Sequence, residues 1–330
     1  MSWKNLKQAS LADALLVEHA ALTELDGVHN LIDWQAIAAE LADIHVKKRG
    51  EQAYPPIIMF KALLLQVWYN LSDPALEKQL ARDLLFRRFV GLSLDQPLPD
   101  HSSLWRFRNL LSEQGRFERL LNQLNTQLAE AGLLIRSGQI SIMDASVITA
   151  SRNRPDKTAD GRSTLDPEAA YNVKAGSDGQ RRTTYGYKVH INVEEDGYIN
   201  KACYTAGNVH DSQCLAILLT GEEHAVYADS AYASQAHDTL LQTRPIRNGI
   251  LKRAYRNTPL SKAARQTSRN HSATRSIVER VSGVMKLHYG MGRARYLGLA
   301  RNQARFMLMA FAYNLKRAFT IHTECHRSTE

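Results

Sequence analysis

Three acidic residues occupy positions where an acidic side chain needs an explanation. Asp144 lies within a largely apolar run that predicts a buried strand, and Asp229 ends a second such run. Glu279 is one of three acids in residues 241–330, a segment that also holds 18 Lys and Arg. Carboxylate oxygens are the ligands that Mg²⁺ and Mn²⁺ prefer. Together the three residues therefore predict a divalent-metal site.

Each acid also has an ordinary structural explanation. A buried salt bridge to Arg or Lys would compensate the charge of Asp144 as well as a metal ion would. Asp229 could cap the turn that follows its strand. Glu279 could simply pair with Arg275 one helical turn earlier, an interaction worth about 0.2–0.5 kcal/mol. Taken singly, none of the three acids establishes a metal site.

Taken together, the three acids suit phosphoryl transfer with two metal ions. Two ions about 3.5–4 Å apart would activate a water or a 3′-hydroxyl on one side of a phosphodiester and stabilise the leaving oxygen on the other. Arg275 and Lys286 fall on the same face of the predicted helix as Glu279, and two cations beside a carboxylate suit an anionic substrate. We therefore expect Asp144, Asp229 and Glu279 to be both the catalytic residues and the ligands of two Mg²⁺ or Mn²⁺ ions.

The positive charge of the chain is concentrated near its C-terminus. The formal net charge is +9, with +15 in residues 241–330 and −6 in residues 1–240. Such a segment is either a solvated cationic surface or a phosphate-binding face, because Arg and Lys that neutralise phosphates supply most non-specific affinity for nucleic acid. We expect a DNA-binding face. The candidate DNA contacts are Arg275, Lys286, Lys252, Arg253, Arg256, Lys262, Arg265, Arg269, Arg106 and Arg108.

The overall composition excludes several classes of protein. With 330 residues the chain has room for two domains, and its 44% hydrophobic and 23% charged residues are typical of globular proteins. No apolar stretch approaches the roughly 18 residues of a membrane span. The first ten residues lack the apolar core of a secretory signal, and the three cysteines are widely scattered. We therefore expect a cytoplasmic protein without membrane contacts.

Residues 1–135 predict an all-α domain. Apolar residues recur at helical spacing in the stretches 11–19, 31–41, 57–70 and 117–128. A short basic helix is predicted at 104–111, after a capping signal at 100–103. Arg106 and Arg108 on this helix would contact DNA, unless the helix is an ordinary amphipathic member of a bundle.

Residues 136–330 predict an α/β domain with a mixed sheet. Strands are expected at 140–149, 187–193, 198–205 and 225–228, with a helix at 212–219 and long helices after the last strand. The first strand has apolar residues on both faces, so it should be central and buried. The polar segment 151–184 predicts a long loop.

Short motifs along nearly the whole chain resemble those of one family. They are similar to the motifs of bacterial insertion-sequence transposases of the DDE class, in the group numbered five of that nomenclature. Each motif is short, but their order along the chain is specific. The matching residues are Pro55-Pro56, Leu64-Leu65-Gln66, Trp68-Tyr69-Asn70-Leu71-Ser72-Asp73, Pro99-Asp100, Trp105-Arg106-Phe107-Arg108, Met143-Asp144-Ala145-Ser146, Gly186-Tyr187-Lys188-Val189-His190, His210-Asp211-Ser212, Tyr227-Ala228-Asp229-Ser230-Ala231-Tyr232, Val278-Glu279-Arg280, Arg295-Tyr296-Leu297-Gly298-Leu299 and Asn314-Leu315-Lys316-Arg317.

The resemblance implies an RNase H-like catalytic domain in residues 136–330, a mixed sheet with flanking helices, preceded by the helical domain of residues 1–135. It also implies that Asp144, Asp229 and Glu279 form the acidic triad of that catalytic domain. The helical domain would contribute to DNA recognition and to assembly.

The family signature around the glutamate is Tyr, two residues, Arg, three residues, Glu, six residues, Lys. Arg275, Glu279 and Lys286 match its last three positions, whereas Ser272 stands where tyrosine is expected. Only 50 residues separate the second aspartate of the triad from the glutamate, so the large module that some related transposases insert there does not fit. We expect the basic span 252–269 to lie in its place and to touch DNA.

The activity that the resemblance implies is Mg²⁺-dependent transposition. Such an enzyme binds the terminal inverted repeats of its element, cuts the strands to free 3′-hydroxyls and joins them to target DNA. The partners would be double-stranded DNA and further copies of the chain, as a homodimer or higher homo-oligomer near the nucleoid. Two rivals remain open, a nuclease of the same fold that does not join and a domesticated DNA-binding regulator. Asp211 is expected to cap the helix that follows it.

Overall fold

The computed structural model describes residues 19–44, 52–133, 139–151, 166–175, 180–252 and 261–327. It divides into two compact units, one of residues 1–133 with 307–330 and the other of residues 134–306. This division falls between residues 133 and 134, and the boundary expected from the sequence falls between 135 and 136. The observed units also differ from the expected domains at the C-terminus, because residues 307–330 belong to the helical unit.

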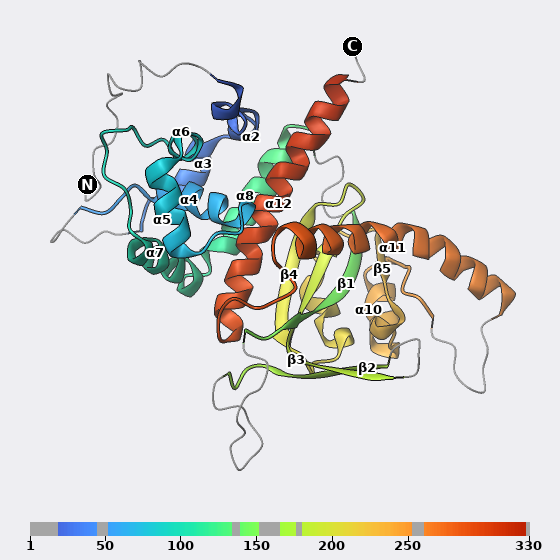
Figure 1. The fold of residues 1–330 in the computed structure, drawn as a ribbon. Coiled ribbons are helices and arrows are strands. Elements are labelled where there is room, and N and C mark those ends of the chain that lie inside the picture. The colour runs from blue at the N-terminus through green and yellow to red at the C-terminus, as the bar shows by residue number, and fades with distance from the viewer. Residues whose placement is uncertain are drawn as a thin grey trace. The chain divides into compact units, whose positions relative to one another are not determined.

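The elements of the first unit are helices (Figure 1). Side chains of Ser72, Asp83 and Asp100 accept hydrogen bonds from backbone N–H groups in the first turns of α5, α6 and α7. The stretch predicted at 11–19 lies, except for His19, outside the described residues. The bounds are η1 (Ala20–Leu22), α2 (Asp26–Asn30), α3 (Trp34–Ala39), α4 (Pro56–Trp68), α5 (Asp73–Arg82), α6 (Leu84–Val90), α7 (His101–Glu113), α8 (Arg116–Glu130) and α12 (Leu299–Arg327) from Met307 onward.

The centre of this unit is α4, which is apolar on nearly all sides. Residues 58–67 are all buried, as a helix without a polar face must be. Its Phe60 ring meets the Phe311 ring of α12 edge to face at 5.0 Å between centroids, and Trp68 Nε1 donates to the Ala312 carbonyl at 3.0 Å. The core of the helical unit thus includes a segment from the far end of the sequence.

One cation, Lys61, is buried in this core. Its Nζ lies 2.7 Å from His29 Nε2 and 4.6 Å from the centroid of the Trp34 ring. Burial lowers the pKa of Lys61 from 10.5 to about 8. Because the unfolded chain binds this proton more tightly than the folded chain, the charge of Lys61 lowers the free energy of unfolding below about pH 10.5, with the full effect below about pH 8.

Lys61→Met is therefore expected to raise the free energy of unfolding near neutral pH by up to about 3 kcal/mol, offset in part by loss of the contact with His29. The advantage of the variant should shrink as the pH rises from about 8 to 10.5, since the unfolded chain then loses its extra proton. Urea unfolding of both proteins across this range measures the difference. Lys78→Met, at an exposed position of α5, is the matched control and should give a flat difference.

The second unit is built on a mixed sheet with the strand order β2-β3-β1-β5-β6, in which β4 also pairs with β3. The pairs β1/β5 and β5/β6 are parallel, and the other pairs are antiparallel. The strand expected at 140–149 has those bounds and is central. The strands are β1 (Ile140–Thr149), β2 (Ala170–Ala175), β3 (Arg181–Val193), β4 (Ile199–Ala206), β5 (Ala225–Ala228) and β6 (Arg247–Asn248).

Both faces of the sheet carry helices. Met143, Val226 and Ala228 pack in one apolar cluster with residues of η2 (Asp211–Cys214), α9 (Leu215–Leu218) and α10 (Gln235–Thr243). Side chains alternate along a strand, so Tyr227 points to the opposite face. There it meets His271 of α11 (Lys262–His288), with the ring centroids 5.2 Å apart. Figure 1 shows α11, in orange, running across the sheet.

The structure corrects the loop expected at 151–184. This segment contains β2, which pairs with the first half of β3 from Ala170 opposite Gly186 to Ala175 opposite Arg181. The sequence hides this pairing because residues 181–184 at the start of β3 are all polar and β2 is only six residues long. In place of the helix expected at 212–219, the structure has two short helical turns, η2 and α9. The structure also contains α10 and β6, which the sequence did not predict. None of the described helices is long and apolar enough to cross a membrane.

Candidate active site

Strand pairing brings the two aspartates together. β1 and β5 are parallel with Met143 opposite Ala228, so Asp144 and Asp229 are the next residues along each strand. The extended backbone of Asp229 (φ −70°, ψ 161°) continues the direction of β5. Both side chains therefore belong to the face that α11 covers, at a point where one strand gives way to a turn. This is where α/β sheets place their ligands.

Asp229 also caps the short helix η3 (Ser230–Tyr232). Its Oδ1 accepts from the Ser230 N–H at 2.6 Å. A carboxylate has two oxygens and about four lone-pair directions, so one cap hydrogen bond leaves capacity for a further ligand. Both explanations that the sequence allowed for Asp229 are therefore compatible with its position.

The environment of Asp144 disfavours its negative charge. Burial raises the pKa of this carboxyl above its usual value, and repulsion from Asp229 adds to the rise. A hydrogen bond from the Ala145 N–H and attraction by Arg275 and Lys174 act in the opposite direction. No ion pair with a contact to Asp144 occurs among the described residues. A divalent cation beside the two aspartates would supply the missing compensation.

Glu279 lies on α11 and makes the ion pair that its spacing predicts. Arg275 Nη2 donates to Glu279 Oε1 at 3.4 Å. The side chain of Glu279 is 60% exposed, whereas that of Arg275 is 12% exposed. A long contact to an exposed carboxylate stabilises little. The pair therefore does not account for a nearly buried guanidinium.

Asp144 and Glu279 line the same hollow, which has a volume of about 460 Å³. Lys286, two helical turns beyond Glu279 on α11, also lines the hollow. Asp229 does not line it. Within the parts of the chain that the structure describes, no group of three His, Cys, Asp or Glu side chains is placed to hold a metal ion. The three-residue metal site expected from the sequence thus stays a prediction.

The residues around the hollow nonetheless fit an anion held beside a divalent ion. Two buried polar atoms of α11, Arg275 Nε and Ser282 Oγ, have no hydrogen-bond partner among the described residues, and Ser282 lines the hollow. Buried polar groups are seldom left in this state. The acids offer only hard oxygen donors, which match Mg²⁺ or Mn²⁺ better than zinc.

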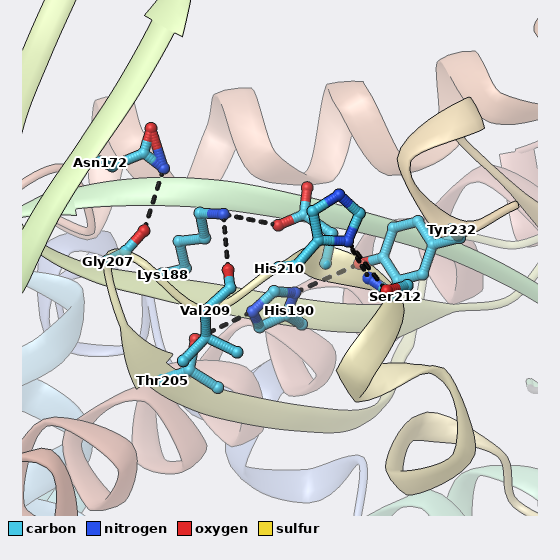
Figure 2. Close-up of polar contacts among 10 residues, drawn as sticks. Asn172, Lys188, His190, Thr205, Gly207, Val209, His210, Ser212 and Tyr232 are labelled. Atoms are coloured by element: carbon cyan, nitrogen blue, oxygen red, sulfur yellow. Dashed lines mark hydrogen bonds and ion pairs between the residues drawn. The ribbon is translucent and has the colours of Figure 1, made fainter. Parts of the chain in front are cut away.

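A buried polar network links β3 to β4 and the segment that follows it (Figure 2). Lys188 Nζ donates to Asp211 Oδ1 and to the Val209 carbonyl, each at 2.8 Å. His190 is hydrogen-bonded to the Tyr232 hydroxyl at 3.3 Å. Burial raises the pKa of Tyr232, and the negative charges of Asp211, Asp144 and Asp229 add to the rise. The network therefore lies within electrostatic reach of both candidate metal ligands.

The expectation that Asp211 caps the following helix is wrong. The cap of η2 is His210, whose Nδ1 accepts from the Ser212 N–H at 3.3 Å. Asp211 is instead the partner of Lys188, and both side chains are largely buried, at 15% and 10% exposed. The sequence offers no sign of the pairing because it depends on the fold of β3 against η2.

Lys188→Met is expected to lower the free energy of unfolding by about 3 kcal/mol, because it leaves the buried carboxylate of Asp211 without its cation. The double variant Lys188→Met/Asp211→Leu should recover most of this loss, since no unpaired charge remains. Urea unfolding of the three proteins measures both effects. Equal losses in the single and double variants would show that the ion pair itself is not the cause.

The candidate DNA contacts divide into several groups. Lys286, Lys252, Lys262, Arg269 and Arg106 are exposed, and Arg106 only donates to Ser103 Oγ at 3.3 Å. Arg275 is the nearly buried partner of Glu279. The remaining candidates of the basic span, Arg253 and Arg256 and the side chain of Arg265, lie outside the described residues.

Arg108 corrects the sequence-based expectation. It is 4% exposed, donates to Asp73 Oδ1 at 2.7 Å and contacts Gln66 Oε1 at 3.3 Å. Its spacing from the buried Leu104 and Phe107 places it on the core face of α7. Arg108 is thus a structural residue of the helical unit rather than a DNA contact.

The sequence also missed two cations of the hollow. Lys174 of β2 and Arg182 of β3 line it together with the acids. Both fall in the segment expected to be a loop. The sign of β2 in the sequence is that polar residues alternate with apolar ones at positions 172 and 174. So short an alternation does not by itself indicate a strand.

Comparison with known families gives matches in both halves of the chain. A model described as "Transposase DDE domain" matches residues 136–315, and one described as "Transposase domain (DUF772)" matches residues 14–110. Among solved structures, the chain is similar to a piggyBac transposase in a synaptic complex with hairpin DNA. That similarity has 10% identity, covers 94% of this chain and 76% of the other, and has a TM-score of 0.44, which is too distant to support an argument. On the family match over more than half of its length, the chain belongs to the DDE-domain transposases, the enzymes of mobile DNA elements.

Proposed function

We propose that this transposase acts on the ends of an insertion sequence of group five, through an RNase H-like catalytic domain that depends on Mg²⁺ or Mn²⁺. The observation that carries the proposal is the pairing of β1 with β5. It makes Asp144 and Asp229 neighbours beneath the helix that carries Glu279. Two aspartates on neighbouring strands, one of which lines the same hollow as Glu279, suit metal-assisted cleavage of a phosphodiester.

In this proposal Asp144, Asp229 and Glu279 hold two ions. The ions, when bound, supply activation of the attacking water or 3′-hydroxyl and stabilisation of the leaving oxygen. Glu279 is exposed enough to change its side-chain rotamer and approach the aspartates. Arg275 is then released from its long contact and can donate to a phosphate of the substrate, as can Lys286 at the rim of the hollow.

The proposed substrate is double-stranded DNA, first the inverted repeats of the element and then the target. The basic residues just before α11 and in its N-terminal part are proposed to contact the DNA backbone. They are Lys252, Arg253, Arg256, Lys262, Arg265 and Arg269. Arg106 of the helical unit is proposed to contact the DNA as well. Two transposon ends must be held together for joining, so we propose a homodimer or larger homo-oligomer.

Purified protein with a supercoiled plasmid that carries both ends tests the proposal. With Mg²⁺ we expect free 3′-hydroxyls at the ends and then products joined to target DNA. Cleavage without any joined product would favour a nuclease. Specific binding without cleavage, in Mg²⁺ and in Mn²⁺, would favour a regulator and remove the catalytic role of the acids.

A further inference from the structure

The β2–β3 strand pair forms one wall of the hollow, and its polarity is the reverse of an ordinary sheet. Two cross-strand pairs line the hollow, Asn172 opposite Thr184 and Lys174 opposite Arg182. On the alternate positions of β2, Tyr171 is 42% and Val173 is 57% exposed. A strand that packs on a core places its apolar face inward. The inward face of this wall is instead built to meet a polar occupant.

Two cations face each other directly on this wall. Lys174 and Arg182 are partners in the ladder, and Cβ atoms of such partners lie about 4.5–5.5 Å apart. Like charges at opposed positions destabilise a sheet. An anion between the two side chains would turn this repulsion into attraction.

The wall is held firmly in place. Asn172 Nδ2 donates to the Gly207 carbonyl at 3.1 Å. The backbone of Gly207 passes so near that a Cβ on it would lie 2.5 Å from the Ala170 carbonyl oxygen, so only glycine fits. β2 is thus docked on the end of the β3–β4 hairpin, and its cations are presented from a rigid element.

The opposite wall is α11, which adds a third cation. Lys286 lines the hollow from this side, beside the unsatisfied Oγ of Ser282. The lining therefore holds Lys174, Arg182 and Lys286 against Asp144 and Glu279. Positive charge from β2–β3 and from α11, with one carboxylate on β1 and one on α11, matches a strand of phosphates that passes over a metal-binding centre.

We propose that Lys174 and Arg182 each bind a phosphate of the DNA backbone, so that β2–β3 and α11 hold the scissile strand between them. The inference rests on the proposed function and deepens it. The basic surface expected from the sequence covers residues 252–269, Arg275 and Lys286 of α11, and Arg106 and Arg108 of α7. The strand pair provides a second, separate set of DNA contacts on the other side of the acids.

Salt-dependent binding of labelled transposon-end DNA to the full-length protein tests the inference. Each phosphate contact contributes about 0.9 to the slope of log K against log salt concentration. Lys174→Ala and Arg182→Ala should each lower the slope by about 0.9, and the double variant by about twice that. Arg181→Ala is the matched control, because Arg181 is also exposed and precedes Arg182 on β3 but falls on the alternate face. Its slope should stay close to that of the wild type.

The outcomes separate the two proposals. If Arg181→Ala and Arg182→Ala change the slope equally, the phosphate contacts of this wall are wrong, while cleavage by the wild type still upholds the proposed function. If the wild type neither binds nor cleaves end DNA, the proposed function itself fails. Lys174→Gln and Arg182→Gln remove the positive charges but keep polar side chains at exposed positions, so both variants should fold like the wild type. A lower slope in these variants, together with an unchanged melting temperature, excludes misfolding as its cause.

Discussion

Asp144→Asn is expected to lower the rate of strand cleavage by about 10³-fold or more and to leave the affinity for end DNA at least as high as that of the wild type. Metal ions stabilise a phosphoryl transition state by several kcal/mol, and about 4 kcal/mol corresponds to roughly 10³-fold in rate. Asparagine has the shape of aspartate and keeps an oxygen for the Ala145 N–H, but its amide is a poor metal ligand. The loss should therefore fall on chemistry alone.

The stability of the same variant provides an independent check. The folded-state pKa of Asp144 lies above its usual value, so the folded protein binds this proton more tightly than the unfolded chain does. The free energy of unfolding of the wild type therefore decreases as the pH rises from the unfolded-state pKa of Asp144 through its folded-state pKa. At neutral pH and with a chelator present, Asp144→Asn should thus have a higher free energy of unfolding than the wild type.

Addition of Mn²⁺ should reverse that order, because an ion that binds only the folded state raises its stability. We expect an upward shift of the melting temperature in the wild type and a much smaller one in the variant. Single-turnover cleavage, filter binding and thermal melting measure the three effects. Normal excision by Asp144→Asn would refute the catalytic role of this residue.

Glu279→Gln is expected to abolish cutting while end binding persists. The side chain is 60% exposed and its contact with Arg275 is long, so the fold loses a few tenths of a kcal/mol at most. The substitution removes one carboxylate from the acidic triad without touching the basic surface. Affinity for DNA should even rise slightly, because one negative charge leaves a site that receives phosphates.

The matched control is Glu195→Gln, which removes another exposed carboxylate, from the turn between β3 and β4. It should cleave at the wild-type rate. Cleavage assays and gel-shift titrations on the same end DNA compare the variants. Loss of binding with normal cutting in Glu279→Gln would contradict the assignment, and so would equal losses of cutting in both variants.

Local signals determined much of the architecture. The run of apolar residues on both faces of β1 specified a central strand with the bounds that the structure shows, because burial on both sides leaves few alternatives. The capping signals at 72–74 and 100–103 predicted helix starts at Ala75 and Leu104, and the structure has them slightly earlier, at Asp73 and His101. The isolation of Glu279 among basic residues singled out one carboxylate in a helix of 27 residues. These features depend on neighbours in sequence, so the sequence alone discloses them.

Tertiary structure decided which of these residues meet. Asp144 and Asp229 become neighbours only through the parallel register of β1 with β5. Arg108 looks like a surface cation until Asp73 and Gln66, both from other helices or their ends, enclose it. Lys174 and Arg182 oppose each other only because β2 pairs with β3. Contacts between residues far apart in the chain are selected by the packing of whole elements, and no local pattern encodes that choice.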